Sequence, residues 1–140
     1  FKLIEMINYY FNNCSSLKNE LERIYAQNGY YLEEQLNIFV DDISIVNNII
    51  SSIDFNSFEN ILFIEDFNKG SRIFKDKSEE ISLPKNNMIK VEFTNGNWFA
   101  IRPSGTEPKI KVYCNTVGNS YNEAKDGLDV LKAKLKNIFK

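Results

Sequence analysis

The sequence contains no histidine among its 140 residues. A Ser-His-Asp triad, a cysteine–histidine nucleophile pair and histidine-ligated metal sites are therefore excluded within this chain. The only two cysteines, Cys14 and Cys114, lie far apart and form no Cys-x-x-Cys pair, which argues against a zinc knuckle or a redox motif. We interpret them as reduced thiols and expect a cytoplasmic protein.

Long apolar runs and a basic excess are also missing. No segment approaches the roughly 20 apolar residues that cross a bilayer, and the first residues, Phe1–Glu5, lack the layout of a signal peptide. The net charge of -2 and the pI near 5.3 argue against a protein that coats a nucleic acid. We expect neither a membrane nor a nucleic-acid partner, so any anion site must be local.

The composition is that of an ordinary globular domain. Hydrophobic residues make up 43% and charged residues 26% of the chain, and no internal repeat or low-complexity tract is present. The length suits a single domain with an appendage. Because the chain begins on Phe1 in the middle of a helical pattern, we expect it to be a piece of a longer protein.

The N-terminal residues have the periodicity of two short helices. Apolar residues recur at helical spacing from Leu3 to Phe11 and again from Leu17 to Tyr25. Ser16 is placed to cap the second helix, and Asn28-Gly29 supplies a left-handed stop. We place a domain boundary near Glu33, so that residues 1–33 form a helical tail of a preceding domain and 34–140 form the C-terminal domain.

The rest of the chain alternates between strand and helix patterns. We expect a strand or a bent pair of strands from Tyr30, an amphipathic helix over Asp42–Ile53, a central strand at Ile61–Ile64, and a loop around Lys69-Gly70-Ser71. Residues 69–87 as a whole show no pattern that predicts a structure. Met88–Phe93 and Trp98–Ile101 flank Asn95-Gly96, a pair that favours a hairpin with a type I′ turn. A further strand is expected at Ile110–Cys114.

The chain ends in a strongly amphipathic helix. Ser120 and Glu123 form a capping box. One face is apolar and consists of Ala124, Leu128, Leu131, Leu135 and Ile138. We interpret the lysines near its end as a solvated face; they are Lys132, Lys134, Lys136 and Lys140. The predicted fold class is α+β, with one antiparallel sheet, two helices on one face of it, and two short helices before it.

The segment from Arg102 to Pro108 carries the candidate chemistry. It reads Arg-Pro-Ser-Gly-Thr-Glu-Pro and joins two predicted strands. The guanidinium of Arg102 offers a bidentate fork, Ser104 and Thr106 offer hydroxyl donors, and Gly105 lets backbone amides approach an anion. These donors can converge on one phosphate group.

Other interpretations of this loop are open at this stage. Such residues also occupy ordinary exposed turns, and Ser104 is a donor rather than a nucleophile because no histidine can activate it. Lys109 and Lys111 should point to the same side of their strand, where one of them could complete the site. The acidic pair Glu65-Asp66 lacks the alternation of a magnesium site and is better explained as a solvent-facing strand end.

The segment Trp98–Tyr113 resembles the C-terminal signature of the α-D-phosphohexomutases, particularly the phosphoglucomutase branch. The stretch Tyr25–Leu32 resembles the junction between the third and fourth domains of that family. The resemblance implies the family's fourth domain, a TATA-binding-protein-like sheet with two helices. It also implies that the loop binds the phosphate of the sugar that is not reacting.

This resemblance assigns phosphate binding to the residues of this chain that match the motif, which are Arg102, Ser104, Gly105, Thr106 and Lys111. Lys111 stands where relatives often carry an arginine, so a point charge replaces a fork. The match for Lys109 is less specific. No catalytic residue and no metal ligand of the family falls within this chain.

The resemblance further implies an enzyme that interconverts hexose 1-phosphate and hexose 6-phosphate through a hexose 1,6-bisphosphate. Its phosphoserine and Mg²⁺ belong to other domains of the polypeptide, so we expect this piece to be inactive alone and to act as a mobile lid. The expected partners are hexose phosphates and the preceding domains. The alternatives are a stand-alone module for phosphorylated ligands and a structural interaction domain.

Overall fold

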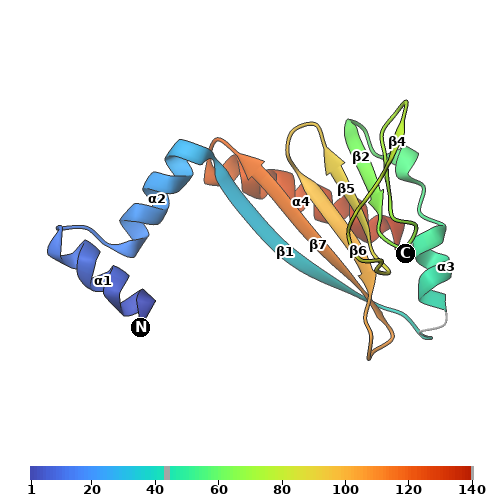
Figure 1. Cartoon of the computed structure of the whole chain (residues 1–140), viewed down its shortest axis with the longest axis horizontal. Helices are drawn as coiled ribbons and strands as arrows, with labels where there is room; N and C mark the ends of the chain where they lie inside the picture. The colour runs from blue at the N-terminus through green and yellow to red at the C-terminus, as the bar shows by residue number, and fades with distance from the viewer. Residues whose placement is uncertain (43–44, 140) are drawn as a thin grey trace.

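A computed structural model describes residues 1–42 and 45–139 of the chain (Figure 1). Its elements in order are α1 (Lys2–Asn12), α2 (Leu17–Asn28), β1 (Tyr30–Phe39), α3 (Val46–Ser51), the 3₁₀ turn η2 (Phe55–Ser57), β2 (Ile61–Asp66), β3 (Ser71–Ile73), β4 (Ser78–Glu80), β5 (Ile89–Phe93), β6 (Trp98–Pro103), β7 (Lys109–Gly118) and α4 (Tyr121–Ile138).

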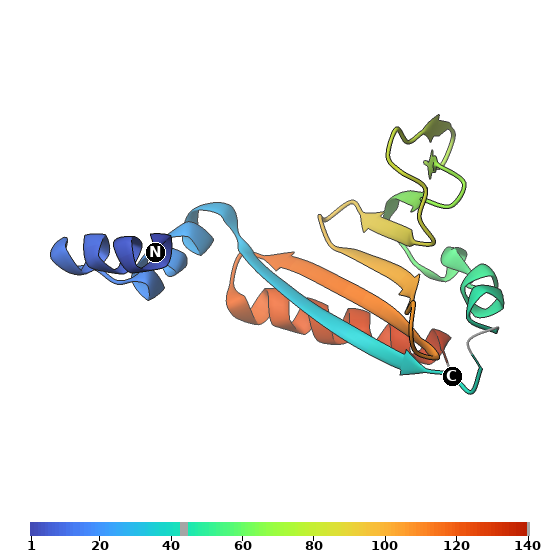
Figure 2. The same cartoon turned by 60° about the horizontal axis from the view of Figure 1, so that its bottom comes forward.

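The strands form one seven-stranded antiparallel sheet in the order β1-β7-β6-β5-β2-β3-β4. Helix α4 packs along one face of this sheet, mainly over β7 and β1, and no described element covers the other face of these two strands (Figure 2). The predicted α+β class with an antiparallel sheet is confirmed. Within the described residues, no helix is long and apolar enough to cross a membrane.

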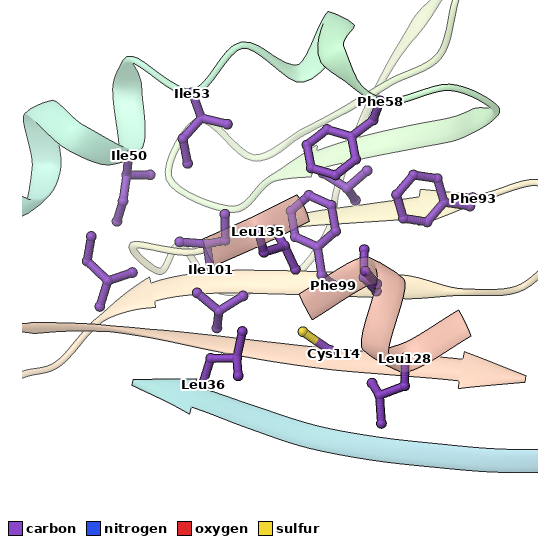
Figure 3. Packing of buried hydrophobic residues seen from close by; sticks show 14 of the residues in the cluster. Leu36, Ile50, Ile53, Phe58, Phe93, Phe99, Ile101, Cys114, Leu128 and Leu135 are labelled. Carbon is purple, nitrogen blue, oxygen red and sulfur yellow. The ribbon is translucent and has the colours of Figure 1, made fainter. Parts of the chain in front are cut away.

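The core lies between the sheet and the helices. Phe99 and Ile101 of β6 are fully buried, as is Leu135 of α4. Ile50 of α3 and Phe58 contribute to the same cluster from the far end of the sheet (Figure 3). Side chains from α3 and α4 therefore share one hydrophobic core, because alternate residues of β5, β6 and β7 all point to the face that both helices approach.

The predicted limits of the two N-terminal helices are confirmed. Ser16 accepts a hydrogen bond from the backbone N–H of Asn19, and Gly29 ends α2 with a φ of 96°. Neither helix contains a buried residue, and both project from the end of β1 away from the sheet (Figure 1). Strand β1 is a single strand that pairs with β7 from Tyr30 to Phe39, so the sheet includes residues on both sides of the expected boundary at Glu33.

The hairpin between β5 and β6 is confirmed, but the predicted type I′ turn is wrong. A type I′ turn needs positive φ at both central residues, and here Gly96 has a φ of 83° whereas Asn95 is not in that region. The N–H of Gly96 donates to the carbonyl of Phe93, and the N–H of Phe93 donates to the carbonyl of Asn97. The connection is therefore a three-residue loop with glycine in the left-handed position.

The middle of the chain differs from the sequence-based expectations in two places. The helix expected over Asp42–Ile53 is only six residues long as α3, and part of its predicted first turn, at residues 43–44, lies outside the described residues. The loop expected around Lys69-Gly70-Ser71 ends at Gly70 because Ser71 begins β3, and residues 69–87, for which the sequence predicts no structure, also contain β4. Each of these strands has three residues, and β4 is entirely exposed, so neither produces an apolar period in the sequence.

Three charged side chains are less exposed than expected. Lys132 is 17% exposed and its Nζ lies 2.6 Å from a carboxylate oxygen of Glu34 on β1, while Lys134 sits over the ring of Phe58. Glu65, expected to face solvent, is 5% exposed and forms an ion pair with Arg72. Long lysine stems cover apolar surface while the charge finds a partner, which a solvated-face interpretation overlooks. Lys136 is exposed, and Lys140 lies outside the described residues.

Candidate phosphate site

The candidate loop connects β6 to β7 and is closed by backbone hydrogen bonds. The N–H of Ser104 donates to the carbonyl of Lys109 at 2.9 Å, and the N–H of Lys109 donates to the carbonyl of Glu107 at 2.7 Å. On the outer side, the N–H of Val40 donates to the carbonyl of Pro108 at 3.0 Å. The loop is thus anchored to three strands' ends, which limits the conformations that its tip can adopt.

Arg102 and Lys111 are cross-strand neighbours. They face each other in the register of β6 and β7, on the face of the sheet opposite the buried pair Ile101 and Val112. Arg102 is exposed and Lys111 is half-buried, and within the residues that the structure describes neither side chain forms an ion pair. Directly opposed like charges destabilise a strand pair, so this arrangement favours an anion that binds both cations.

The donors predicted in the loop lie at its tip. Gly105 and Thr106 are exposed, and Ser104 is 5% exposed with its amide engaged in closing the loop. No hydrogen bond within the described part of the chain engages the Ser104 hydroxyl. An added Cβ at Gly105 would meet nothing within 4 Å, and its φ is not positive. The backbone of the unliganded chain therefore does not require glycine at position 105, and the space beside Gly105 is open to a ligand.

Lys109 is placed differently from Lys111, although both occupy the outward-facing side of β7 as expected. The Nζ of Lys109 lies 2.6 Å from Oε2 of Glu107 and 5.8 Å from the centroid of the Phe39 ring, and its side chain is 15% exposed. Its hydrogen bond lowers the pKa of Glu107 below the ordinary value, with Lys111 contributing at longer range. The charge of Lys109 is therefore already neutralised by Glu107, whereas the ammonium of Lys111 is available to an anionic ligand.

The contacts of Glu107 and Phe39 were not anticipated from the sequence. Glu107 and Lys109 are two positions apart, a spacing that allows an ion pair across a tight turn. This spacing of opposite charges is visible in the sequence and could have predicted the ion pair. Phe39 reaches the site because β1 pairs with β7 in the register Phe39 to Lys109, and Asn37 likewise lies opposite Lys111. No local pattern reveals that long-range register.

The part of the chain that the structure describes holds no group of three or more cysteine, aspartate or glutamate side chains that could bind a metal ion. The side chains around the loop are cationic and hydroxylic, apart from the Glu107 carboxylate, which is paired with Lys109. They do not fit a magnesium ion, whose ligands are oxygens of carboxylates, carbonyls and water.

A comparison with protein families matches residues 62–130 to the C-terminal domain of phosphoglucomutases and phosphomannomutases. The matched range runs from the second residue of β2 through β7 into α4, and it therefore includes the whole candidate loop.

Individual relatives agree with this match. The chain is 33% identical over 123 residues to a phosphoglucomutase of Staphylococcus saprophyticus, which covers 79% of this chain and 22% of that protein. It is 29% identical over 126 residues to a phosphoglucomutase of Staphylococcus aureus strain MSSA476, covering 83% of this chain and 23% of that protein. A phosphoglucomutase of Staphylococcus epidermidis is 49% identical over 55 residues, covering 38% of this chain and 10% of that protein. The chain spans less than a quarter of the length of these relatives.

Proposed function

Because the chain belongs to the phosphoglucomutase/phosphomannomutase family through its C-terminal domain, we propose that it binds the phosphate group of a hexose phosphate at the loop between β6 and β7. In the intact enzyme this would be the phosphate that is not reacting. The proposed ligands are the guanidinium of Arg102, the ammonium of Lys111, the hydroxyls of Ser104 and Thr106, and the amide at Gly105.

The observation that carries this proposal is that Arg102 and Lys111 lie side by side on one face of the sheet, and that among the described residues neither of them has an ion-pair partner. A phosphate monoester carries a charge between about −1.5 and −2 at neutral pH, which matches two cations. Arginine supplies two parallel donors and lysine supplies a compact charge, so together they hold the anion and orient it.

The proposed role is positioning rather than bond making. The phosphoserine and Mg²⁺ that the family uses would supply phosphoryl transfer from other domains. The loop would hold the distal phosphate, so that binding energy remote from the reacting bond orients the sugar and excludes water. Interconversion of hexose 1-phosphate and 6-phosphate through a bisphosphate would then require the loop to bind the phosphate at either position of the sugar.

We further propose that α1 and α2 pack against a preceding domain of the same polypeptide. Their apolar residues are exposed, including Leu3 at 60%, Ile4 at 59% and Ile24 at 47%. The apolar face of an amphipathic helix is normally buried against a neighbouring element, so this exposure is unusual. The relatives are more than four times as long as the aligned part of this chain. In that setting the sheet with α3 and α4 would form the TATA-binding-protein-like fourth domain and close over the active site.

The proposal is tested by the affinity of the 140-residue chain for glucose 1-phosphate, with Arg102→Ala as the disruptive variant and Arg102→Lys as the conservative one. Loss of a charge-assisted bidentate contact should weaken binding by about tenfold or more for Arg102→Ala, and less for Arg102→Lys. Glucose is the control ligand and should not bind at the same concentrations. Equal affinities for the wild-type chain and Arg102→Ala would refute the proposal.

A further inference from the structure

We propose that Glu107 and Lys109 form a latch that sets the shape of the phosphate-binding loop, so that Lys109 is a positioning residue and not a phosphate ligand. This inference rests on the proposed phosphate site and deepens it. It assigns a role to two charged residues that the phosphate-binding assignment leaves without one.

The latch closes the loop at residue 109 from three directions. The backbone carbonyl of Lys109 accepts from Ser104 N–H, its N–H donates to the Glu107 carbonyl, and its Nζ lies 2.6 Å from Glu107 Oε2. The two backbone bonds hold the loop's ends, and the ion pair adds a side-chain tie across the same turn. The tip with Gly105 and Thr106 lies between these ties.

The surroundings of Lys109 keep its charge within the latch. Its side chain is 15% exposed, against 54% for Glu107, and its ammonium faces the Phe39 ring of the neighbouring strand. A lysine covered in this way needs a partner for its charge, which Glu107 supplies at short range. Turning Lys109 toward a ligand would break the ion pair and the contact with the aromatic ring together.

The charges of the site also agree with the division of roles. Glu107 and Lys109 cancel, which leaves Arg102 and Lys111 to face the ligand with two positive charges. The hydrogen bond from Lys109 lowers the pKa of Glu107 below its ordinary value, which agrees with a carboxylate that is charged and paired within the latch. Since ordering a loop costs binding free energy, a loop that is closed before the ligand arrives binds more tightly.

Two neutralising variants separate the latch from simple electrostatics. Glu107→Gln raises the net charge of the site by one and Lys109→Met lowers it by one. If charge alone set the affinity, the first variant would bind phosphate more tightly and the second less tightly. If the latch orders the loop, both should bind inorganic phosphate more weakly, by roughly three- to tenfold.

A charge swap provides the rescue. The double variant Glu107→Lys with Lys109→Glu keeps the net charge and restores an ion pair with reversed polarity. We expect it to recover the wild-type dissociation constant to within about threefold. If Lys109 were a direct ligand, Lys109→Met and the double variant would both stay weak while Glu107→Gln would not weaken binding, and the proposal would be overturned.

The measurement is a titration of the 140-residue chain with inorganic phosphate, followed at the amide resonances of Gly105 and Thr106. The matched control is Glu79→Gln, which breaks the ion pair of Lys77 and Glu79 at the same two-residue spacing away from the site. This control should leave phosphate affinity unchanged, and unperturbed amide resonances of α4 verify that each variant is folded.

The variant Arg102→Ala, measured in the same series, separates the latch proposal from the phosphate-site proposal. Lost binding in Arg102→Ala with unchanged binding in both neutralising variants overturns only the latch, whereas unchanged binding in Arg102→Ala overturns the phosphate site itself.

Discussion

At the scale of single residues, Arg102 and Lys111 show how the proposed phosphate site differs from a surface that only stabilises the fold. Two cations stand opposite each other on adjacent strands with no carboxylate paired to either of them in the described part of the chain. Such a pair costs stability in the free protein, and an anion that binds both relieves the cost. The proposed site would thus be stabilised by its ligand rather than by its own fold.

This view predicts opposite effects of one substitution on stability and on binding. Lys111→Gln should stabilise the free chain by about 0.2–1 kcal/mol, because it removes the repulsion with Arg102, while phosphate affinity falls. Urea denaturation at low ionic strength measures the first effect, and it should shrink in high salt because screening already weakens the repulsion. A destabilised Lys111→Gln variant at low salt would show that the two charges do not repel.

The cysteines differ in the reactivity expected of them. Cys114 is 1% exposed, and burial, followed by the nearby Glu34 carboxylate, raises the pKa of its thiol to about 11. The thiolate is the reactive form, so at pH 8 Cys114 stays protonated as well as covered. Cys14 is exposed. A thiol reagent at pH 8 should therefore modify Cys14 rapidly in the folded chain and Cys114 only after denaturant is added. Rapid modification of both cysteines would contradict the packing of β7 against α4.

At the scale of elements, β7 and α4 are joined by a tight connection that depends on Gly118. A Cβ at this position would lie 2.6 Å from the backbone nitrogen of Ala124 and 3.0 Å from Cβ of Glu123. The Ser120 hydroxyl meanwhile accepts from the N–H of Glu123, and the Glu123 carboxylate accepts from the N–H of Asn119. The first turn of α4 is therefore held against the end of β7 and has little room to move.

Gly118→Ala should consequently destabilise the chain by about 1–3 kcal/mol, the usual cost of overpacking against backbone. Gly105→Ala is the matched control, because its added Cβ meets no atom within 4 Å. Thermal unfolding of both variants measures the difference. Equal melting temperatures for Gly118→Ala and Gly105→Ala would mean that α4 does not approach β7 as closely as described.

The elements that the sequence predicted well are those with strong local signals. Helix α4 has a cap and a continuous apolar face, and the hairpin of β5 and β6 has a glycine turn between two apolar runs. β3 and β4 escaped prediction because three-residue strands acquire their structure from pairing with β2 and not from their own composition. The type I′ turn was wrong because an Asn-Gly pair also suits a three-residue loop in which only the glycine is left-handed.

At the scale of the whole molecule, the sheet determines which residues of the site meet. The residues of the loop were identifiable because they are contiguous in sequence, from Arg102 to Lys111. The opposition of Arg102 and Lys111 and the approach of Phe39 to Lys109 depend on the order β1-β7-β6, which long-range pairing sets. The sequence therefore identifies the candidate ligands, and the fold distinguishes the lysine that is available from the one that is already paired.

The central claim is that the loop between β6 and β7 is a phosphate site, and the most direct test is where phosphate binds on the chain. We predict that titration with glucose 1-phosphate shifts the amide resonances of Gly105 and Thr106 most strongly, and that Arg102→Ala abolishes these shifts without altering those of α4. Shifts that centre elsewhere, for example on the lysines at the end of α4, or that persist unchanged in Arg102→Ala, would contradict the account.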